Sequence, residues 1–439
     1  MKNNLPLILF NPKLPKLSKN EKAVLKLLVE AGKLIAPLYL VQEKQINQGI
    51  SKEKIEKAAK KDPDILSPYT VLESTDGKII SVPYHIKYAK FLKPIAEKLE
   101  TASKLTENKQ FARFLKLQAK ALLDGSYEDA IVAWLKMKPY ILDISIGPVE
   151  HFDDRLFFAK ASYQSWIGVV NTEKTKRFNY YKQIILSTRR EALVPDQRLE
   201  NPNRVKVKID DVIIFSGHMA RTKFVGVNMP MNLSFVEKYG SEITLFPLVN
   251  ELRINEQILP AFNKIFSVVF RKGFSKADLR KGNISYIALH ELAHNYLYYK
   301  NAAKNLQDLL SPIYELCATI LGLRMAGSLL LKDIITNKEL EQMVVAFICR
   351  GFYLIEQSKE TKSWVNYATG GAIFVNYMIK SGALKQYQGL AIPNFTKIFV
   401  SLHDLSYELE YLLSSGTRKE AAIFIKKYGY FQKSRWNLT

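Results

Sequence analysis

Cysteine is almost absent from this sequence: Cys317 and Cys349 are the only two among 439 residues. So few cysteines exclude a disulfide framework and fit a reducing compartment. The one apolar run near the N-terminus, residues 5–10, is interrupted by Pro6 and is too short for the core of a signal peptide. We also expect no stretch long enough to span a bilayer. The sequence therefore predicts a soluble, cytoplasmic protein.

Low-complexity tracts and internal repeats are also missing, and hydrophobic residues make up 47% of the chain. This composition excludes an intrinsically disordered protein and supplies enough apolar surface for packed cores. Because 439 residues exceed the usual size of a single core, we expect two lobes around a cleft.

Acidic residues are too few to balance the basic ones, and the formal net charge is +22. Such an excess favours acidic partners. The lysines are scattered, however, and the modest clusters at 52–61 and 271–281 lack the interleaved aromatic residues of a nucleic-acid groove. Nucleic acid is therefore an alternative partner, suggested by charge alone, and not the expected one.

Hydrophobic periodicity predicts a chain that is mostly helical, with a few strands. Helical patterns cover residues 19–61, 86–123, 127–135 and 157–169, and nearly everything after residue 255. Strands are predicted at 141–146, 212–215 and 224–227, and a hairpin at 69–84. We therefore predict a predominantly helical α+β fold with an N-terminal lobe over 1–185, a crossover segment over 186–255 that adds strands to the cleft, and a helical lobe over 256–439.

The most informative stretch runs from residue 285 to 296 and contains His290, Glu291 and His294. Histidines four residues apart on a helix lie on one face, so both imidazoles can reach a single zinc ion. Glu291 follows the first histidine and can take a proton from a zinc-activated water. No Gly or Pro interrupts residues 284–299, which supports a helix. The lobe over 256–439 is therefore predicted to be a zinc-binding catalytic lobe.

A catalytic zinc site needs a third protein ligand, and Glu315 is the candidate. Ser311 and Pro312 predict the start of the next helix, with Ser311 as its N-cap and Glu315 in its first turn. A histidine pair without metal is the alternative reading, but two buried imidazoles and a carboxylate on one apolar face are costly without a cation. We expect one zinc ion per chain.

Several further blocks of sequence resemble the dipeptidyl peptidase III family of zinc metallopeptidases, especially its shorter bacterial and plant-type relatives. These blocks follow the family's order along the chain and are Ser67-Pro-Tyr-Thr-Val-Leu-Glu, Ile146-Gly-Pro-Val-Glu-His-Phe-Asp-Asp, Gly226-Val-Asn-Met-Pro, Glu315-Leu-Cys-Ala-Thr and Ala372-Ile-Phe-Val-Asn-Tyr-Met. The resemblance implies enzymes that release dipeptides from the N-terminus of short peptides. It also implies that Glu150 pairs with the substrate ammonium and that Asn228 hydrogen-bonds the substrate backbone. The structural alternatives are a strand-end acid for Glu150 and a turn residue for Asn228.

Several positions depart from the family pattern. Asn295 stands where Gly is usual, and Tyr314 and Thr319 stand where acids are usual, so support of the zinc ligands is expected to be weaker. Tyr367 matches a histidine that helps to stabilise the oxyanion, and a tyrosine hydroxyl can donate the same hydrogen bond. Its alternative role is that of a packing aromatic between its neighbours in the helix. Phe152 replaces a residue that is often Tyr.

Together these residues predict a zinc-dependent peptidase with Glu291 as general base, Tyr367 as an oxyanion donor and short peptides as substrates. A catalytically weak relative that binds peptide or another ligand in the same cleft is the first alternative. A zinc hydrolase acting on a non-peptide amide or ester is another. A monomer is favoured, and the remaining histidines are expected to be structural or at the surface, namely His85, His151, His218 and His403.

Overall fold

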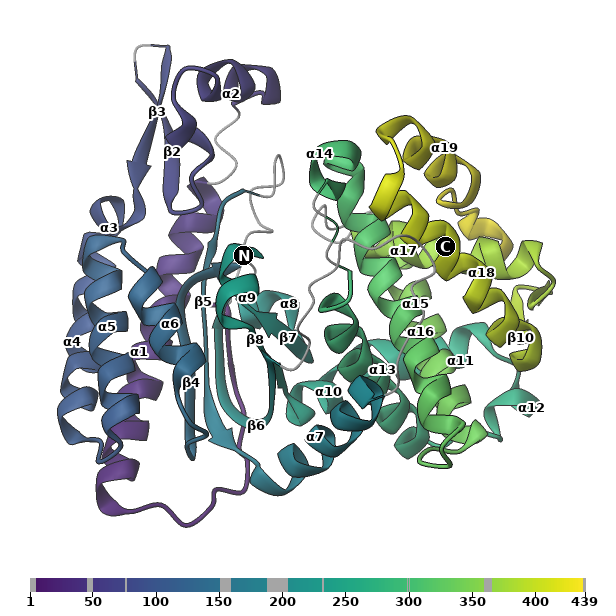
Figure 1. The fold of residues 1–439 in the computed structure, drawn as a ribbon, viewed down its shortest axis with the longest axis horizontal. Coiled ribbons are helices and arrows are strands. Elements are labelled where there is room, and N and C mark those ends of the chain that lie inside the picture. Colours follow the sequence, from purple (N-terminus) through teal and green to yellow (C-terminus); the bar gives the residue numbers. More distant parts are fainter. Residues whose placement is uncertain are drawn as a thin grey trace. The chain divides into compact units, whose positions relative to one another are not determined.

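The computed structural model describes residues 5–45, 50–75, 77–150, 159–187, 204–230, 233–297, 299, 301–358 and 365–436 (Figure 1). The chain divides into two compact units that do not follow chain order. Unit 1 comprises Met1–Thr175, Lys208–Phe224 and Met229–Glu242, and unit 2 comprises Lys176–Val207, Val225–Asn228 and Ile243–Thr439. The predominantly helical α+β fold is confirmed, whereas the boundaries at residues 185 and 255 stay a prediction.

Six strands form the main sheet, in the order β4-β5-β6-β8-β7, with β1 paired to β6. The pairs β1–β6, β4–β5 and β5–β6 are antiparallel. The strands are β1 (Leu7–Leu9), β4 (Leu142–Glu150), β5 (Ser162–Val170), β6 (Val205–Gly217), β7 (Gly226–Met229) and β8 (Ser241–Leu245). The separate hairpin of β2 (Thr70–Thr75) and β3 (Lys78–Pro83) agrees with the predicted hairpin.

The helix predicted over 157–169 is wrong, because the described part of that segment forms strand β5. Every residue of β5 except Val170 is buried, so both faces of the strand are covered and no alternation of polar residues marks it. A continuous run of apolar and aromatic residues can be either a buried strand or a buried helix. Two other features were not predicted: the short helix α8 (His218–Thr222) and the hairpin of β9 (Leu384–Tyr387) and β10 (Leu390–Pro393).

Helices of the first part of the chain pack beside the sheet in unit 1 (Figure 1). Helix α1 contacts both α4 and β5, and Gly32 permits the close approach, because a Cβ there would lie 2.5 Å from Cδ1 of Ile167. Besides α8, the helices of unit 1 are α1 (Lys19–Gln45), α2 (Lys52–Ala59), η1 (Pro63–Leu66), α3 (Tyr84–Lys87), α4 (Ala89–Leu105), α5 (Lys109–Asp124), α6 (Glu128–Lys136) and α9 (Leu233–Tyr239), and α7 (Thr172–Ser187) begins in unit 1 and continues in unit 2.

Charged side chains are buried inside unit 1. The ammonium of Lys208 bridges the carboxylates of Asp143 and Glu242, and its nitrogen lies 2.6 Å from the nearer oxygen of Asp143. Burial disfavours the charged ammonium, but the two carboxylates outweigh this cost and raise the pKa of Lys208. Asp210 is fully buried as well, and burial together with the negative charge of Asp143 raises the pKa of its carboxyl well above the usual value.

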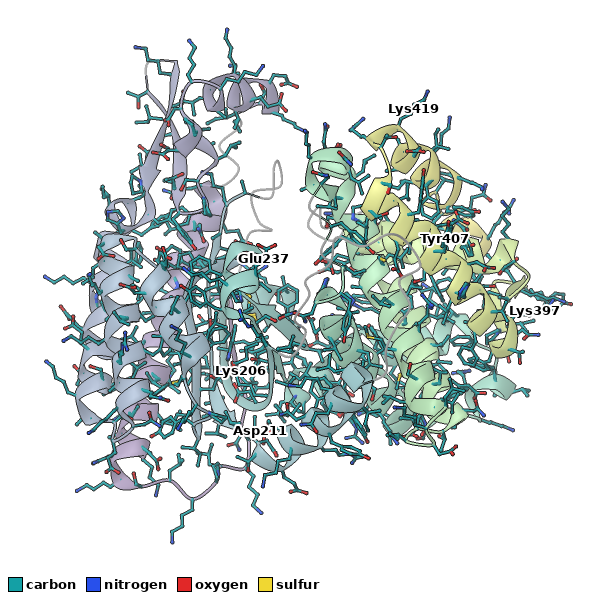
Figure 2. All side chains as sticks on the ribbon, in the orientation of Figure 1. Lys206, Asp211, Glu237, Lys397, Tyr407 and Lys419 are labelled. Carbon is teal, nitrogen blue, oxygen red and sulfur yellow. The ribbon has the colours of Figure 1, made fainter. Side chains whose placement is uncertain are left out.

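Unit 2 is almost wholly helical. Besides most of α7, the strand β7 and the hairpin of β9 and β10, it contains α10 (Pro247–Arg253), η3 (Ile254–Ile258), α11 (Leu259–Ile265), α12 (Val268–Arg271), α13 (Lys276–His294), α14 (Ala302–Leu306), η4 (Gln307–Leu309), α15 (Leu310–Leu330), α16 (Asn337–Gln357), α17 (Val365–Lys380), α18 (Phe395–Ser415), α19 (Arg418–Tyr428) and η6 (Lys433–Trp436). Helix α15 is central, because it contacts α13, α16, α17 and α18. Basic side chains such as Lys397 and Lys419 project outward from α18 and α19 (Figure 2).

Helix α15 corrects one expectation, because residues Ala302–Leu330 are long and apolar enough to cross a membrane by length and composition. The most apolar window of this segment is 67% buried inside the protein. A helix that is apolar on all sides and surrounded by four other helices is typical of a protein core. The hydropathy of α15 therefore reflects its central place in unit 2.

Candidate metal centre

The predicted motif lies on the last turns of α13. The helix begins with a capping box, in which the side chains of Ser275 and Asp278 each accept a backbone hydrogen bond from the other residue. The helix ends at His294, and the next residue, Asn295, donates a side-chain hydrogen bond to the carbonyl of Glu291 at 3.3 Å. The side-chain amide of Asn295 therefore caps the C-terminal end of the helix, immediately after the motif.

His290, His294 and Glu315 converge on one point in unit 2. The two Nε2 atoms of the histidines are 3.1 Å apart. One carboxylate oxygen of Glu315, Oε2, lies 3.4 Å from Nε2 of His290 and 3.7 Å from Nε2 of His294. All three side chains are largely buried, with 12 to 14% of each side chain exposed.

The three atoms fit the ligand set of a zinc ion. Ligand atoms at bond lengths of about 2.0–2.2 Å in a tetrahedron are separated from one another by about 3.3–3.6 Å. The observed separations of 3.1, 3.4 and 3.7 Å bracket that edge length. Two imidazole nitrogens and a carboxylate oxygen also form a ligand set that is common in catalytic zinc sites. The residues present therefore match the predicted metal.

Glu291 is a second carboxylate near the histidines, and it could compete with Glu315 for the role of third ligand. Ligand atoms of His290, Glu291 and His294 all lie within 4.8 Å of one another. Glu315 belongs to a different helix, α15, and its Oε2 atom lies within 3.7 Å of both histidine nitrogens. Glu315 therefore has the geometry of a third ligand, and Glu291 lies on the same helix as the two histidines, within 4.8 Å of them.

The neighbouring helix α15 begins earlier than predicted, because Ser311 and Pro312 lie inside its first turn and Leu309 is the N-cap. Consequently Glu315 belongs to the second turn of α15. Gly322 lies seven residues after Glu315 and therefore on the same face of the helix. A Cβ at Gly322 would lie 2.9 Å from the backbone nitrogen of His290, so the absence of a side chain lets α15 approach α13 closely.

Thr319 supports His290 from the same face of α15. Its hydroxyl donates to the carbonyl of Glu315 at 3.2 Å and lies 2.9 Å from Nδ1 of His290. Because the hydroxyl proton is used on the carbonyl, the hydroxyl accepts a hydrogen bond from Nδ1–H of His290. This tautomer leaves the lone pair of Nε2 directed at the metal position.

His294 is supported by a stacked ring. The ring centroids of His294 and Tyr314 are 5.0 Å apart and their planes differ by 30°. Within the described ranges, Nδ1 of His294 is buried and makes no hydrogen bond. Tyr314 therefore holds this imidazole by packing, at a position where the family resemblance led us to expect an acid.

Burial and neighbouring charges set the protonation of the site. Burial lowers the pKa of His294 to about 4, so its ring is neutral at pH 7 and available as a ligand. Burial acts to lower the pKa of His290, but its hydrogen bond to Glu315 and the charge of Glu291 outweigh this effect and raise the pKa. A proton on Nε2 makes that hydrogen bond when no metal is bound, and a metal ion would displace this proton and use the Nε2 lone pair. Burial raises the pKa of Glu291 to about 7, which suits a group that accepts and returns a proton near neutral pH.

Asn228 is tied to the same site. It lies on β7, and its side-chain nitrogen donates to the carbonyl of Glu291 at 3.1 Å. Its Oδ1 atom is buried and makes no hydrogen bond with any residue that the structure describes. A buried acceptor without a donor is costly, and a backbone N–H of a bound chain would satisfy it.

The remaining predicted site residues lie as follows. Tyr367 lies on α17, is 37% exposed and hydrogen-bonds the carboxylate of Glu315. Glu150 is the last residue of β4 and is paired with Ser162 of β5, in unit 1. Phe152 and His151 lie outside the described residues. Of the other histidines, His218 is buried against Tyr39, His85 is partly buried, and His403 is exposed.

Some side chains at the site were missed from the sequence. Arg253 is buried and acts electrostatically on both Glu291 and Tyr367. Gly322 makes the contact between α13 and α15 possible. An arginine near the end of an amphipathic helix usually lies in solvent, and a glycine within a helix has no distinctive sequence pattern. No local signal would have identified either residue.

Three comparisons with known proteins bear on the family. Residues 18–185 match the model of peptidase family M49. The fold resembles dipeptidyl peptidase III from Caldithrix abyssi, at 18% identity and a TM-score of 0.79 over 98% of this chain and 94% of the other. It also resembles dipeptidyl-peptidase III from Corallococcus sp. strain EGB, at 21% identity and a TM-score of 0.81 over 98% and 92%.

A curated relative is Nudix hydrolase 3 of Arabidopsis thaliana, which is 24% identical over 368 residues, or 81% of this chain. The chain spans about half the length of that relative, because the match covers 46% of it. The family match and the fold confirm the resemblance to the dipeptidyl peptidase III family. The matched residues 18–185 do not include the metal centre, so the role of the centre is argued from its own geometry.

Proposed function

We propose that this chain, as a relative of the dipeptidyl peptidases III, is a zinc-dependent peptidase that removes dipeptides from the N-terminus of short peptides. The observation that carries the proposal is the convergence of two histidine nitrogens and one carboxylate oxygen within 3.7 Å of one another, with a second carboxylate, Glu291, beside them. A zinc ion bound there would polarise the scissile carbonyl and lower the pKa of a water molecule.

Glu291 is the proton carrier in this proposal. It accepts a proton from the attacking water and passes that proton to the amine that leaves when the peptide bond breaks. Its burial and its raised pKa allow both transfers near neutral pH. Its backbone carbonyl is held by the amides of Asn228 and Asn295, which keeps the residue in place during the reaction.

Tyr367 and Asn228 act on the substrate in this proposal. The hydroxyl of Tyr367 has a single proton, which it donates to Glu315 in the absence of substrate. In this proposal the hydroxyl turns that proton to the oxygen that becomes negative during attack. The buried Oδ1 of Asn228 accepts a backbone N–H of the peptide. Glu150 would bind the free amino terminus, as the family resemblance implies, and this charge pair would set the cut after the second residue.

Hydrolysis of a dipeptidyl arylamide tests the proposal, with zinc counted by elemental analysis. We expect about one zinc per chain, loss of activity with a chelator and recovery with zinc. Glu291→Gln should keep the metal and lose activity by at least about a hundredfold. Turnover that persists in Glu291→Gln would overturn the role of Glu291. A protein that contains no zinc, both as purified and after incubation with zinc, would overturn the metal site.

A catalytically weak relative that binds peptide in the same site is the second candidate. The observation that favours it is the hydroxyl of Thr319 on His290, because a carboxylate at that position would make the imidazole a stronger ligand. Stoichiometric zinc with tight peptide binding, but without turnover on a library of short peptides, would select this candidate over the first.

A further inference from the structure

A buried lysine lies between two carboxylates on the main sheet, within unit 1. The ammonium nitrogen of Lys208, on β6, lies 2.6 Å from Oδ1 of Asp143 on β4, and it also contacts the carboxylate of Glu242 on β8. The exposed fractions of these three side chains are only 11%, 2% and 10%. An amine, a carboxyl carbon and a second carboxylate are therefore held together with little access for water.

The carboxyl group of Asp143 is held by two further side chains. The indole N–H of Trp166, on β5, donates to Oδ2 of Asp143 at 3.0 Å. Gly168 pairs with Asp143 in the sheet, and a Cβ at Gly168 would lie 2.5 Å from Oδ1 of Asp210, so the missing side chain leaves room for that carboxyl. Asp210 hydrogen-bonds Asp143, and a bond between two carboxyl groups requires a proton on one of them. Both contacts draw electrons away from the carboxyl carbon of Asp143.

The surroundings of this group favour a loss of charge. The ammonium of Lys208 lies 5.2 Å from the ring centre of Trp134, and Trp134 and Trp166 are 8% and 0% exposed. Taking an ammonium and a carboxylate out of water is costly, and their attraction offsets that cost only in part. An amide between Lys208 and Asp143 would remove both charges and would keep one N–H that can donate to Glu242.

We propose that Lys208 and Asp143 form an amide bond within the chain, which crosslinks β6 to β4 across β5. The nitrogen of Lys208 attacks Cγ of Asp143, a C–N bond forms, and one C–O bond breaks to release water. Because Nζ is 2.6 Å from Oδ1, it lies within about 4 Å of Cγ. Two groups held at such a distance react without the entropy loss of an encounter in solution.

Glu242 is the proton carrier of this step. It accepts the protons that the nitrogen of Lys208 loses and passes them to the departing oxygen of Asp143. The N–H of Trp166 stabilises Oδ2 while that atom is negative. The ammonium supplies both protons of the water, so one cation and one anion give a neutral amide and water, and Glu242 ends as it began. No other reagent is consumed.

The ion pairs also set the rate of the reaction. Asp143 and Glu242 raise the pKa of Lys208, so the free amine that attacks is a small fraction at any time. We therefore expect the bond to form slowly, after folding has brought the strands together. The product holds β4, an end strand of the main sheet, by a crosslink that needs no cysteine and that restricts the unfolded chain as a disulfide does.

The intact mass of the full chain tests the bond directly. Protein that is freshly purified and protein that has been stored are unfolded and weighed by mass spectrometry. We expect the stored protein to be lighter than its sequence by one water molecule, and its protease digest to contain one branched peptide that joins the segments of Lys208 and Asp143. The full unmodified mass after storage would overturn the inference. A water loss that maps to a single unbranched segment, as a cyclised aspartate gives, would overturn it too.

Two variants test the roles of the side chains. Lys208→Arg keeps the positive charge between the carboxylates but offers no amine, so this variant should keep its full mass. Glu242→Gln keeps the shape of the side chain and removes the proton acceptor, so the water loss should be slower by at least about a hundredfold.

Asp211→Asn is the matched control, because Asp211 is also on β6 but contacts Asn171 and Lys174 instead. It should lose water as completely as the unsubstituted protein. Complete water loss in Lys208→Arg would show that the reaction uses another residue and would overturn the assignment. Since the mass is measured without substrate or zinc, the result does not depend on the peptidase proposal.

Discussion

The hydroxyl oxygen of Thr319 lies 2.9 Å from Nδ1 of His290, on the side of the ring opposite the nitrogen that faces Glu315. Replacing Thr319 by Val removes this acceptor while nearly keeping the side-chain volume. The supporting hydrogen bond of a metal-binding histidine typically contributes 10- to 100-fold in metal affinity. We therefore expect Thr319→Val to weaken zinc binding by about that factor, measured by competition with a chromogenic chelator.

Thr319→Ser is the control for this substitution, because it keeps the hydroxyl. We expect the serine variant to bind zinc within about threefold of the unsubstituted protein. Equal zinc affinity for all three proteins would mean that the hydroxyl does not support the metal ligand.

Tyr367→Phe removes the hydroxyl that hydrogen-bonds Glu315 and keeps the ring. If this hydroxyl donates to the developing oxyanion, kcat on a dipeptidyl arylamide should fall by about 100-fold or more with little change in KM. Tyr407→Phe is the control, because Tyr407 is an exposed tyrosine of α18 (Figure 2). An unchanged kcat in Tyr367→Phe would favour the packing role instead.

Gly322→Ala tests the close contact between α13 and α15. The added Cβ would lie 2.8 to 3.0 Å from three backbone atoms of Leu289 and His290, and backbone atoms cannot move aside cheaply. We expect urea unfolding to show a loss of about 1–3 kcal/mol in the free energy of unfolding, together with weaker zinc binding.

Gly327→Ala on the same helix is the matched control, because a Cβ there would meet nothing within 4 Å. This variant should be neutral or more stable by up to about 1 kcal/mol, since alanine favours a helix over glycine. If the two variants behave alike, the approach of the helices does not depend on Gly322.

Asp210→Asn tests the buried acid in unit 1 through the pH dependence of stability. The pKa of Asp210 is raised in the folded protein, so the folded state holds a proton that the unfolded state has already released. The carboxyl of Asp210 therefore contributes to the free energy of unfolding below about pH 4, the pKa of an aspartate in the unfolded chain. This contribution is lost as the pH rises through the higher pKa that Asp210 has in the folded protein. Asparagine cannot ionise and should avoid this loss.

We expect Asp210→Asn to be more stable than the unsubstituted protein at pH 7, by at least about 1 kcal/mol, and to lose that advantage near pH 4. Asp211→Asn is the control, because Asp211 is less buried and contacts Asn171 and Lys174. Its effect should be about 0.5 kcal/mol or less at both pH values. A variant at Asp210 that is less stable at pH 7 would show that Asp210 is ionised in the folded protein.

The convergence of the three side chains proposed as metal ligands could be predicted because their pattern is local. His290 and His294 share one helical face by spacing alone, and Glu315 lies on α15, which is the next long helix of the chain and packs against α13. The hairpin of β2 and β3 was predictable for the same reason, since its turn and its two strands are adjacent in sequence. Sequence analysis therefore predicted the arrangements that depend on one element or on two elements close together in the chain.

Features that depend on distant packing were not predicted. Strand β5 has no polar face because both of its sides are covered, so its sequence alone fits a helix equally well. Arg253 reaches the metal centre only because α10 and η3 pack beside α13, which no local pattern encodes. The stacking of Tyr314 on His294 was not predicted either, because a contact between two particular rings depends on how α13 and α15 pack.

The hydrogen bond from Asn228 to the carbonyl of Glu291 has a consequence for engineering this protein. If the proposed function holds, residues 226–228 would be the natural place to alter which peptides are accepted, yet this strand also anchors the last turn of the helix that bears Glu291, the proposed proton carrier. A substitution that is chosen to widen specificity there would therefore also change the rate of the reaction. Libraries that vary this strand should therefore hold Asn228 constant and select for rate and affinity separately.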